Sequence, residues 1–160
     1  MNRSHLFRPR DPAAPLVPPP AVAGLAGLGG FLVDRAIGQR PVLPRWLRPL
    51  GVGAIASGIA LGVWGFLHFK RRDVDPSPWN RPTGFVTDGP YAITRNPMYT
   101  GSVLALAGVG LMRGTVAGLL SPALFMAILT RGQIAFEEAA LEDAYGDDYV
   151  AYKRRVRRWL

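Results

Sequence analysis

Long apolar blocks separated by charged stretches dominate the chain. The blocks cover residues 16–37, 50–69, 98–112 and 114–130. Residues 50–69 carry no charged side chain, and a helix of that length spans a hydrocarbon core of about 30 Å at about 1.5 Å per residue. Such blocks are poor candidates for soluble strands and good ones for membrane helices. The pattern predicts an all-α, polytopic membrane helix bundle with about four transmembrane segments.

The first segment is the least clearly defined of the four, and the last two segments form a pair. The uncharged core of the first segment, residues 21–33, is short and ends at Asp34. It either spans with its ends among the headgroups or is re-entrant. The third and fourth segments meet at the short polar turn "MRGT", which predicts a tight helical hairpin. Small residues recur at four-residue spacing, which favours close helix packing: they are Ala54, Gly58 and Gly62, and Gly110, Gly114 and Gly118.

The two ends of the chain differ in composition from the apolar blocks. Residues 1–20 are rich in proline and arginine, which predicts an extended, solvated tail before a single domain over residues 21–160. Residues 131–160 predict cytoplasmic helices that are interrupted at Gly146. The last of them carries a tyrosine, valine and tryptophan face opposite a basic one. That pattern is typical of an amphipathic interfacial helix that anchors the protein to anionic lipid.

The net charge of +8 and its distribution predict the orientation. No nucleic-acid module accompanies the basic residues, so anionic lipid headgroups are the expected partner and nucleic acid is not. Fourteen of the 19 lysines and arginines lie on the side shared by the tail, the loop 70–97 and the C-terminal region. The positive-inside rule therefore places both termini and the loop in the cytoplasm.

Candidate chemistry lies at the two cytoplasmic ends of the hairpin. The stretch "GPYAITRNPMYTG", residues 89–101, precedes the third segment, and Glu137 and Glu138 follow the fourth. A hairpin brings these stretches to one membrane depth. Taken singly, each residue has a structural alternative, because Asn96-Pro97 suits a helix start and tyrosines are common at membrane interfaces. The chain has no cysteine, and its two histidines lack metal-ligand spacing, so we expect no metal site.

Three separated signatures together resemble one family. Gly-Pro-Tyr, Arg-Asn-Pro-Met-Tyr-x-Gly, and Glu-Glu-x-x-Leu followed by Tyr-Gly-x-x-Tyr-x-x-Tyr occur in its order within residues 50–160. The chain thereby resembles the isoprenylcysteine carboxyl methyltransferase and phospholipid methyltransferase superfamily of integral membrane enzymes. Asn96 stands where many relatives of the isoprenylcysteine branch have histidine, whereas asparagine is frequent among bacterial members. The expected location is the bacterial inner membrane, with the active site on the cytoplasmic side.

The resemblance implies a set of site residues and a cofactor. It implies S-adenosylmethionine bound on the cytoplasmic side, beneath the C-terminal segment. The expected cofactor-binding residues are Gly89, Tyr91, Arg95, Asn96, Pro97, Tyr99, Glu137 and Glu138. We expect Arg95 and Glu138 to be catalytic. The expected acceptor-binding residues are Tyr149, Tyr152 and Trp159.

The methyl acceptor is open at this point. The leading expectation is a lipid-like acceptor such as an isoprenylcysteine-type carboxylate, with a phospholipid amine or a small thiol as alternatives. A carboxylate or thiolate needs no general base, whereas an amine needs one. The alternative from another class is a non-catalytic membrane packing or assembly protein, which would not bind the cofactor. The C-terminal helix is either a lid over the pocket or only an anchor.

Overall fold

The computed structural model describes residues 17–74 and 84–160. Most of the predicted tail, residues 1–16, lies outside the described residues, and so does the part 75–83 of the predicted loop. Within the described ranges every regular element is helical. This confirms the all-α prediction.

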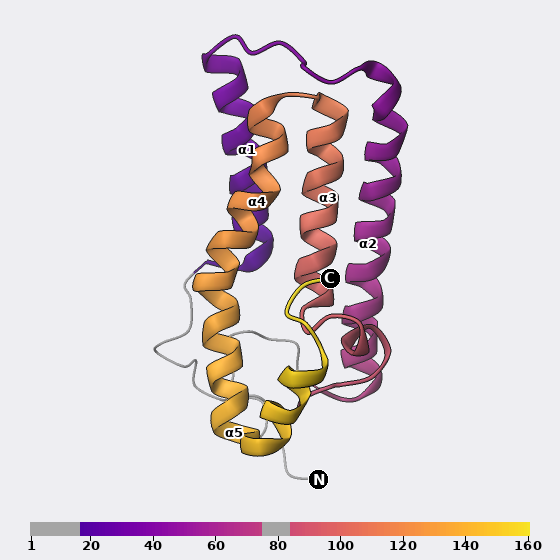
Figure 1. Cartoon of the computed structure of the whole chain (residues 1–160), viewed down its shortest axis with the longest axis vertical. Helices are drawn as coiled ribbons and strands as arrows, with labels where there is room; N and C mark the ends of the chain where they lie inside the picture. The colour runs from indigo at the N-terminus through magenta and orange to yellow at the C-terminus, as the bar shows by residue number, and fades with distance from the viewer. Residues whose placement is uncertain (1–16, 75–83) are drawn as a thin grey trace.

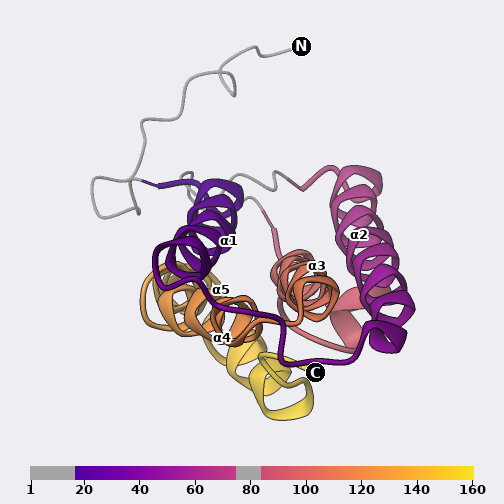
Figure 2. The same ribbon diagram turned by 90° about the horizontal axis from the view of Figure 1, so that it is seen from above.

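The described helices follow the predicted segments closely. They are α1 (Pro19–Ala36), η1 (Arg45–Leu47), α2 (Arg48–Arg71), η2 (Gly89–Ala92), α3 (Pro97–Arg113), α4 (Val116–Arg131) and α5 (Gln133–Arg155). Helix α3 packs between α2 and α4, and α1 packs on the far side of α4 (Figures 1 and 2). Helix α5 continues beyond α4 and then turns back, so that the C-terminus lies beside the lower end of α3 in Figure 1.

The outer faces of the helices are apolar, as expected of a protein that lies in a membrane. On α2 the buried residues are glycines, whereas Leu50 and Ile59 are 60% and 58% exposed. By length and composition, two helical stretches of the described chain are able to cross a membrane, Arg45–Arg71 and Val116–Arg155. In the second stretch the apolar part is α4. Helices α1 and α3 do not meet the same criterion, and their crossing stays a prediction.

Helices α2 and α3 are joined along a seam of glycines. Gly51, Gly58 and Gly65 are the buried residues of α2. A Cβ added at Gly58 would lie 2.4 Å from the carbonyl oxygen of Gly101 on α3, and one at Gly51 would lie 2.6 Å from that of Gly108. The backbones therefore approach so closely that no side chain fits between them. The spacing along this seam is seven residues rather than the predicted four.

The predicted hairpin between α3 and α4 is confirmed. Gly114 follows the last residue of α3 and has a left-handed φ of 68°, and Thr115 caps α4 by accepting a hydrogen bond from the Gly118 backbone N–H at 3.3 Å. The Thr115 hydroxyl also donates to the buried Asp34 carboxylate at 2.6 Å, which forms an ion pair with Arg113. These contacts fix the end of α1 to the hairpin turn.

The apolar core lies at the other end of the hairpin. Phe125 and Leu129 of α4 pack with Ile134 of α5 and Ala26 of α1, and Trp159 from the C-terminus packs against this cluster. The core therefore links α1 and α4 to the polar segments that follow α4.

The C-terminal region departs from the prediction. Gly146 interrupts the helical path with φ 51° and ψ −127°, as predicted, but the helix then ends at Arg155 and Val156 is extended. Tyr149 and Tyr152 are 2% and 3% exposed, so the aromatic face of this helix packs against the protein. The predicted helix to the chain end is therefore wrong, and the interfacial role is not confirmed.

Candidate active site

The hairpin brings together the two polar stretches that the sequence separates. Arg95 lies just before α3, and its Nη2 donates to Oε1 of Glu138 at 2.6 Å. One helical turn further on, the Tyr99 hydroxyl donates to Oε1 of Glu137 at 2.6 Å. The predicted proximity of the two stretches is thus confirmed.

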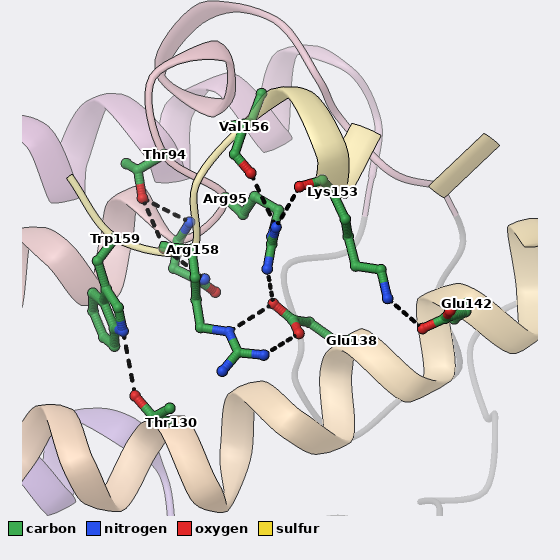
Figure 3. Close-up of polar contacts among 10 residues, drawn as sticks. Thr94, Arg95, Thr130, Glu138, Glu142, Lys153, Val156, Arg158 and Trp159 are labelled. Carbon is green, nitrogen blue, oxygen red and sulfur yellow. Dashed lines mark hydrogen bonds and ion pairs between the residues drawn. The ribbon is translucent and has the colours of Figure 1, made fainter. Parts of the chain in front are cut away.

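Glu138 is saturated by two arginines. Besides Arg95, Arg158 donates from Nε to Oε1 at 3.0 Å and from Nη2 to Oε2 at 2.5 Å (Figure 3). Burial alone would raise the pKa of the Glu138 carboxyl, but the hydrogen bonds and charges of Arg158 and Arg95 outweigh it and hold this pKa below its usual value. Glu138 is therefore ionised and fully engaged within the protein.

Glu137 has a different environment. Its Oε1 accepts hydrogen bonds from Tyr99 and, at 2.7 Å, from Nε2 of Gln133. Burial raises the pKa of the Glu137 carboxyl, and the hydrogen bonds from Tyr99 and Gln133 offset this only in part. Among the described residues none donates to the second oxygen, Oε2. The carboxylate is therefore fixed through one oxygen and has the other free within the described part of the chain.

The last residues, 156–160, form an extended strap across the stretch 94–96. The Arg95 backbone N–H donates to the Arg157 carbonyl at 2.9 Å. The carbonyl of Arg158 accepts from the Thr94 hydroxyl at 3.0 Å (Figure 3) and from Nδ2 of Asn96, also at 3.0 Å. We call residues 156–160 the C-terminal strap.

Side chains fasten both ends of the C-terminal strap. At its start, Nη1 of Arg95 donates to the carbonyls of Lys153 and Val156 at 3.0 and 2.9 Å. At its end, the indole N–H of Trp159 donates to the Thr130 hydroxyl at 3.3 Å. Arg95 therefore joins α3, α5 and the strap through a single guanidinium.

Two predicted site residues shape the backbone. Pro97 begins α3 as predicted, with Asn96 at the N-cap position. The Asn96 side chain does not cap the helix, because it binds the strap instead. Gly89 has a φ of 58°, and a Cβ there would lie 2.8 Å from Cε1 of His68. His68 in turn contacts Asp88 at 3.1 Å between Nε2 and Oδ1, which fastens the end of α2 to this turn.

Aromatic side chains line the region between η2 and α5. The Tyr152 hydroxyl donates to the backbone carbonyl of Tyr91 at 2.7 Å. Phe85 packs edge-on to Tyr149 and Phe69 edge-on to Tyr91. Burial raises the pKa of Tyr152 to about 12, so its hydroxyl stays protonated and donates at any physiological pH.

Most residues of this site lie within a stretch of the chain that matches a known family. A model of the phospholipid methyltransferase family matches residues 46–148. The chain belongs to this family. The matched residues run from η1 into α5 and include Arg95, Tyr99 and both glutamates, whereas the C-terminal strap lies beyond them. The resemblance noted in the sequence is thereby confirmed.

Three curated proteins are similar to parts of the chain. An uncharacterized protein of Haemophilus influenzae is 40% identical over 63 residues, which are 39% of this chain and all of that protein. The protein-S-isoprenylcysteine O-methyltransferase of Schizosaccharomyces pombe is 32% identical over 77 residues, 48% of this chain and 33% of that one. The cobalt-zinc-cadmium resistance protein CzcN of Cupriavidus metallidurans is 27% identical over 115 residues, 69% of this chain and 49% of that one. The match therefore spans 33% of the Schizosaccharomyces pombe protein and 49% of the Cupriavidus metallidurans protein.

Three buried polar atoms at the site lack a hydrogen-bond partner. They are the Tyr91 hydroxyl, Nε of Arg95 and Oε1 of Gln133. Two of them are donors and one is an acceptor. Buried polar groups in folded proteins are nearly always paired, and these three belong to residues of the two stretches that the hairpin brings together.

Sequence reasoning missed two residues of this site. Arg158 stands in a run of basic residues, "KRRVRR", in which nothing distinguishes one arginine from another. Gln133 precedes Glu137 by four residues, the helical spacing at which side chains meet. That spacing was the available signal for Gln133, and no comparable signal existed for Arg158.

Proposed function

We propose that this chain is an integral membrane methyltransferase that uses S-adenosylmethionine to methylate a lipid-like acceptor. Membership of the phospholipid methyltransferase family supports the reaction class. The similarity to a protein named protein-S-isoprenylcysteine O-methyltransferase supports the same class. The observation that carries the proposal is the set of three buried polar atoms without a protein partner, on Tyr91, Arg95 and Gln133, beside the adjacent glutamates 137 and 138.

The residues at this cluster fit the cofactor. S-adenosylmethionine offers a carboxylate that accepts hydrogen bonds, and an ammonium and ribose hydroxyls that donate them. The Tyr91 hydroxyl and Nε of Arg95 are unpartnered donors, and Gln133 provides an unpartnered acceptor. Glu137 adds a carboxylate. When bound, the cofactor supplies a methyl group activated by its sulfonium.

The residues of this chain hold and enclose the ligand. Because Glu138 is saturated by Arg95 and Arg158, we assign it the task of keeping Arg95 and the C-terminal strap in place. The strap and the aromatic rings of Tyr149 and Tyr152 exclude water from the cluster. Methyl transfer is an in-line displacement that depends on alignment, and fixed positioning alone supplies roughly 7–11 kcal/mol in favourable systems.

A lipid-like acceptor suits the exterior of the molecule. The outer faces of α1 and α2 are apolar, so an acceptor with acyl or prenyl chains reaches the cluster from the bilayer. An isoprenylcysteine-type carboxylate is our leading acceptor, and a phospholipid amine or small thiol is the alternative. Tyr149, Tyr152 and Trp159 are the proposed acceptor-side residues. The basic residues favour a cytoplasmic site in a bacterial inner membrane with anionic lipid.

Cofactor binding followed by transfer tests the proposal. Purified protein is titrated with S-adenosylmethionine by calorimetry and then incubated with labelled cofactor and a membrane lipid extract, from which the labelled product is identified. We expect binding and labelled lipid. Arg95→Ala should weaken binding roughly ten- to a hundredfold, the value of a charge-assisted hydrogen bond, whereas Arg154→Ala, at an exposed position, should bind like wild type. Absence of binding at millimolar cofactor would instead support the non-catalytic packing protein.

A further inference from the structure

Gln133 lies in a place where a glutamine is unexpected. It is the first residue of α5 and only 3% exposed, next to the apolar core that contains Ile134. Its orientation follows from chemistry, because only the amide NH2 group can donate to the Glu137 carboxylate, which it does at 2.7 Å. The amide carbonyl, Oε1, is therefore the atom left buried without a partner.

An unpartnered buried carbonyl destabilises the protein unless a ligand supplies the missing donor. The Glu137 carboxylate does not need the amide of Gln133 as a donor, because Tyr99 already donates to the same carboxylate oxygen. Fixing Glu137 in place therefore does not explain why the carbonyl of Gln133 is buried without a partner.

Charge identifies the donor that this carbonyl lacks. Within the described residues, Glu138 forms ion pairs with two arginines, whereas Glu137 forms none. A partly buried carboxylate without a cation beside it favours a positively charged ligand. The free oxygen of Glu137 and the free carbonyl of Gln133 together match a cation that carries several N–H donors.

We propose that Glu137 and Gln133 form an acceptor pair that binds a primary ammonium group of a ligand. The inference rests on the proposed function, and it adds Gln133 to the site. Two sources of this ammonium are consistent with it: the amino-acid end of S-adenosylmethionine and the headgroup of an amine-containing phospholipid acceptor. A ribose hydroxyl pair is a poorer match, because it would leave the Glu137 charge uncompensated.

Matched ligands separate the two sources. Wild type, Gln133→Met and Glu137→Gln are titrated by calorimetry with S-adenosylhomocysteine and with 5′-methylthioadenosine, which lacks the amino-acid end. If the cofactor supplies the ammonium, Gln133→Met lowers the affinity for S-adenosylhomocysteine roughly tenfold or more and leaves that for 5′-methylthioadenosine unchanged. Glu137→Gln gives the same pattern. The amino-acid end carries an ammonium and a carboxylate, and a carbonyl oxygen accepts a hydrogen bond only from the ammonium. A change in affinity for S-adenosylhomocysteine alone would therefore report the contact between Gln133 and the ammonium.

A second arm uses short-chain phosphatidylethanolamine, with short-chain phosphatidylcholine as the control that has no N–H donor. If the headgroup supplies the ammonium, Gln133→Met weakens binding of phosphatidylethanolamine only. Gln39→Met, at the opposite end of the hairpin where Gln39 accepts from the Ala117 backbone, is the matched control and should bind every ligand like wild type. The melting temperature of each unliganded variant shows whether it is folded.

The outcomes distinguish this inference from the function on which it rests. Wild-type protein that binds neither S-adenosylhomocysteine nor S-adenosylmethionine would overturn the proposed function, and it would overturn the acceptor pair as well if Gln133→Met also left the binding of phosphatidylethanolamine unchanged. Wild type that binds S-adenosylhomocysteine, with folded Gln133→Met matching it for all four ligands, would overturn the acceptor pair alone and leave the proposed function standing.

Discussion

Glu137 and Glu138 are adjacent in the sequence, yet their side chains meet different partners. Successive residues of a helix are rotated by about a quarter turn or more, so Glu138 meets Arg95 and Arg158 while Glu137 meets Tyr99 and Gln133. The resemblance in the sequence predicted the double glutamate as a candidate motif, and the hairpin predicted that it lies near Arg95. The division between a saturated and a half-free carboxylate was not predictable, because most of the partners come from distant parts of the chain.

Asn96 makes a contact that tells which substitutions keep the C-terminal strap in place. Its Nδ2 donates to the Arg158 carbonyl at 3.0 Å, and a histidine at this position also offers an N–H donor. We therefore predict that Asn96→His keeps the C-terminal strap in place. Asn96→Asp, which replaces the donor by a carboxylate facing a carbonyl, should destabilise the strap by about 1–3 kcal/mol.

Amide hydrogen exchange of the peptide that contains the strap measures this difference. Asn96→Asp should exchange faster there by roughly five- to a hundredfold, while Asn96→His and wild type exchange alike. Equal protection in the aspartate variant would show that this hydrogen bond does not hold the strap.

At the scale of elements, the helices were predictable and their contact faces were not. Uncharged runs define α2 and α4 directly, and the polar turn defines the hairpin. Glycines occur on α2 at spacings of four and of seven, and the sequence does not say which set faces α3. The structure uses Gly51, Gly58 and Gly65, because these three positions share one face after two helical turns each.

The glycine seam gives a sharp stability prediction. A Cβ at Gly58 would lie 2.4 Å from a backbone carbonyl of α3, which cannot give way cheaply, whereas one at Gly53 meets nothing within 4 Å. Gly58→Ala should therefore lower the free energy of unfolding by about 1–3 kcal/mol, a typical cost of overpacking. Gly53→Ala should leave it unchanged or slightly higher, because alanine favours the helix. Thermal unfolding of both variants in one detergent checks this, and similar melting temperatures would contradict the seam.

At the scale of the whole molecule, the sequence predicted which regions meet but not the element that closes them. The hairpin topology brings Arg95 to the glutamates, and this followed from the apolar blocks. The C-terminal strap did not, because the spacing of Tyr149, Tyr152 and Trp159 fitted a continued helix. The chain is extended there instead, because the backbone carbonyls of Arg157 and Arg158 accept hydrogen bonds from donors of residues 94–96. A continued helix would leave those donors unpaired.

Deleting residues 157–160 should therefore open the cluster without unfolding the hairpin. The deletion removes the acceptors of Thr94 and Asn96, one of the two arginines of Glu138, and the packing of Trp159. We expect affinity for S-adenosylhomocysteine to fall by tenfold or more, since each lost charge-assisted hydrogen bond is worth about 1.5–3 kcal/mol. Helix content by circular dichroism should stay close to wild type.

Two single substitutions distinguish a specific contact of the strap with Glu138 from a general attraction of basic residues to the membrane. Arg158→Ala removes the side chain that binds Glu138 and should reproduce much of the loss. Arg157→Ala removes an equal charge, but Arg157 contributes its backbone carbonyl to the contact with Arg95, so this variant should bind like wild type. If both variants lost affinity equally, charge attraction to lipid would explain the effect, and the C-terminal region would be the anchor that its sequence suggested. A loss confined to Arg158→Ala would make the strap the part of the molecule that closes the site, because of these two arginines Arg158 is the one whose side chain binds Glu138.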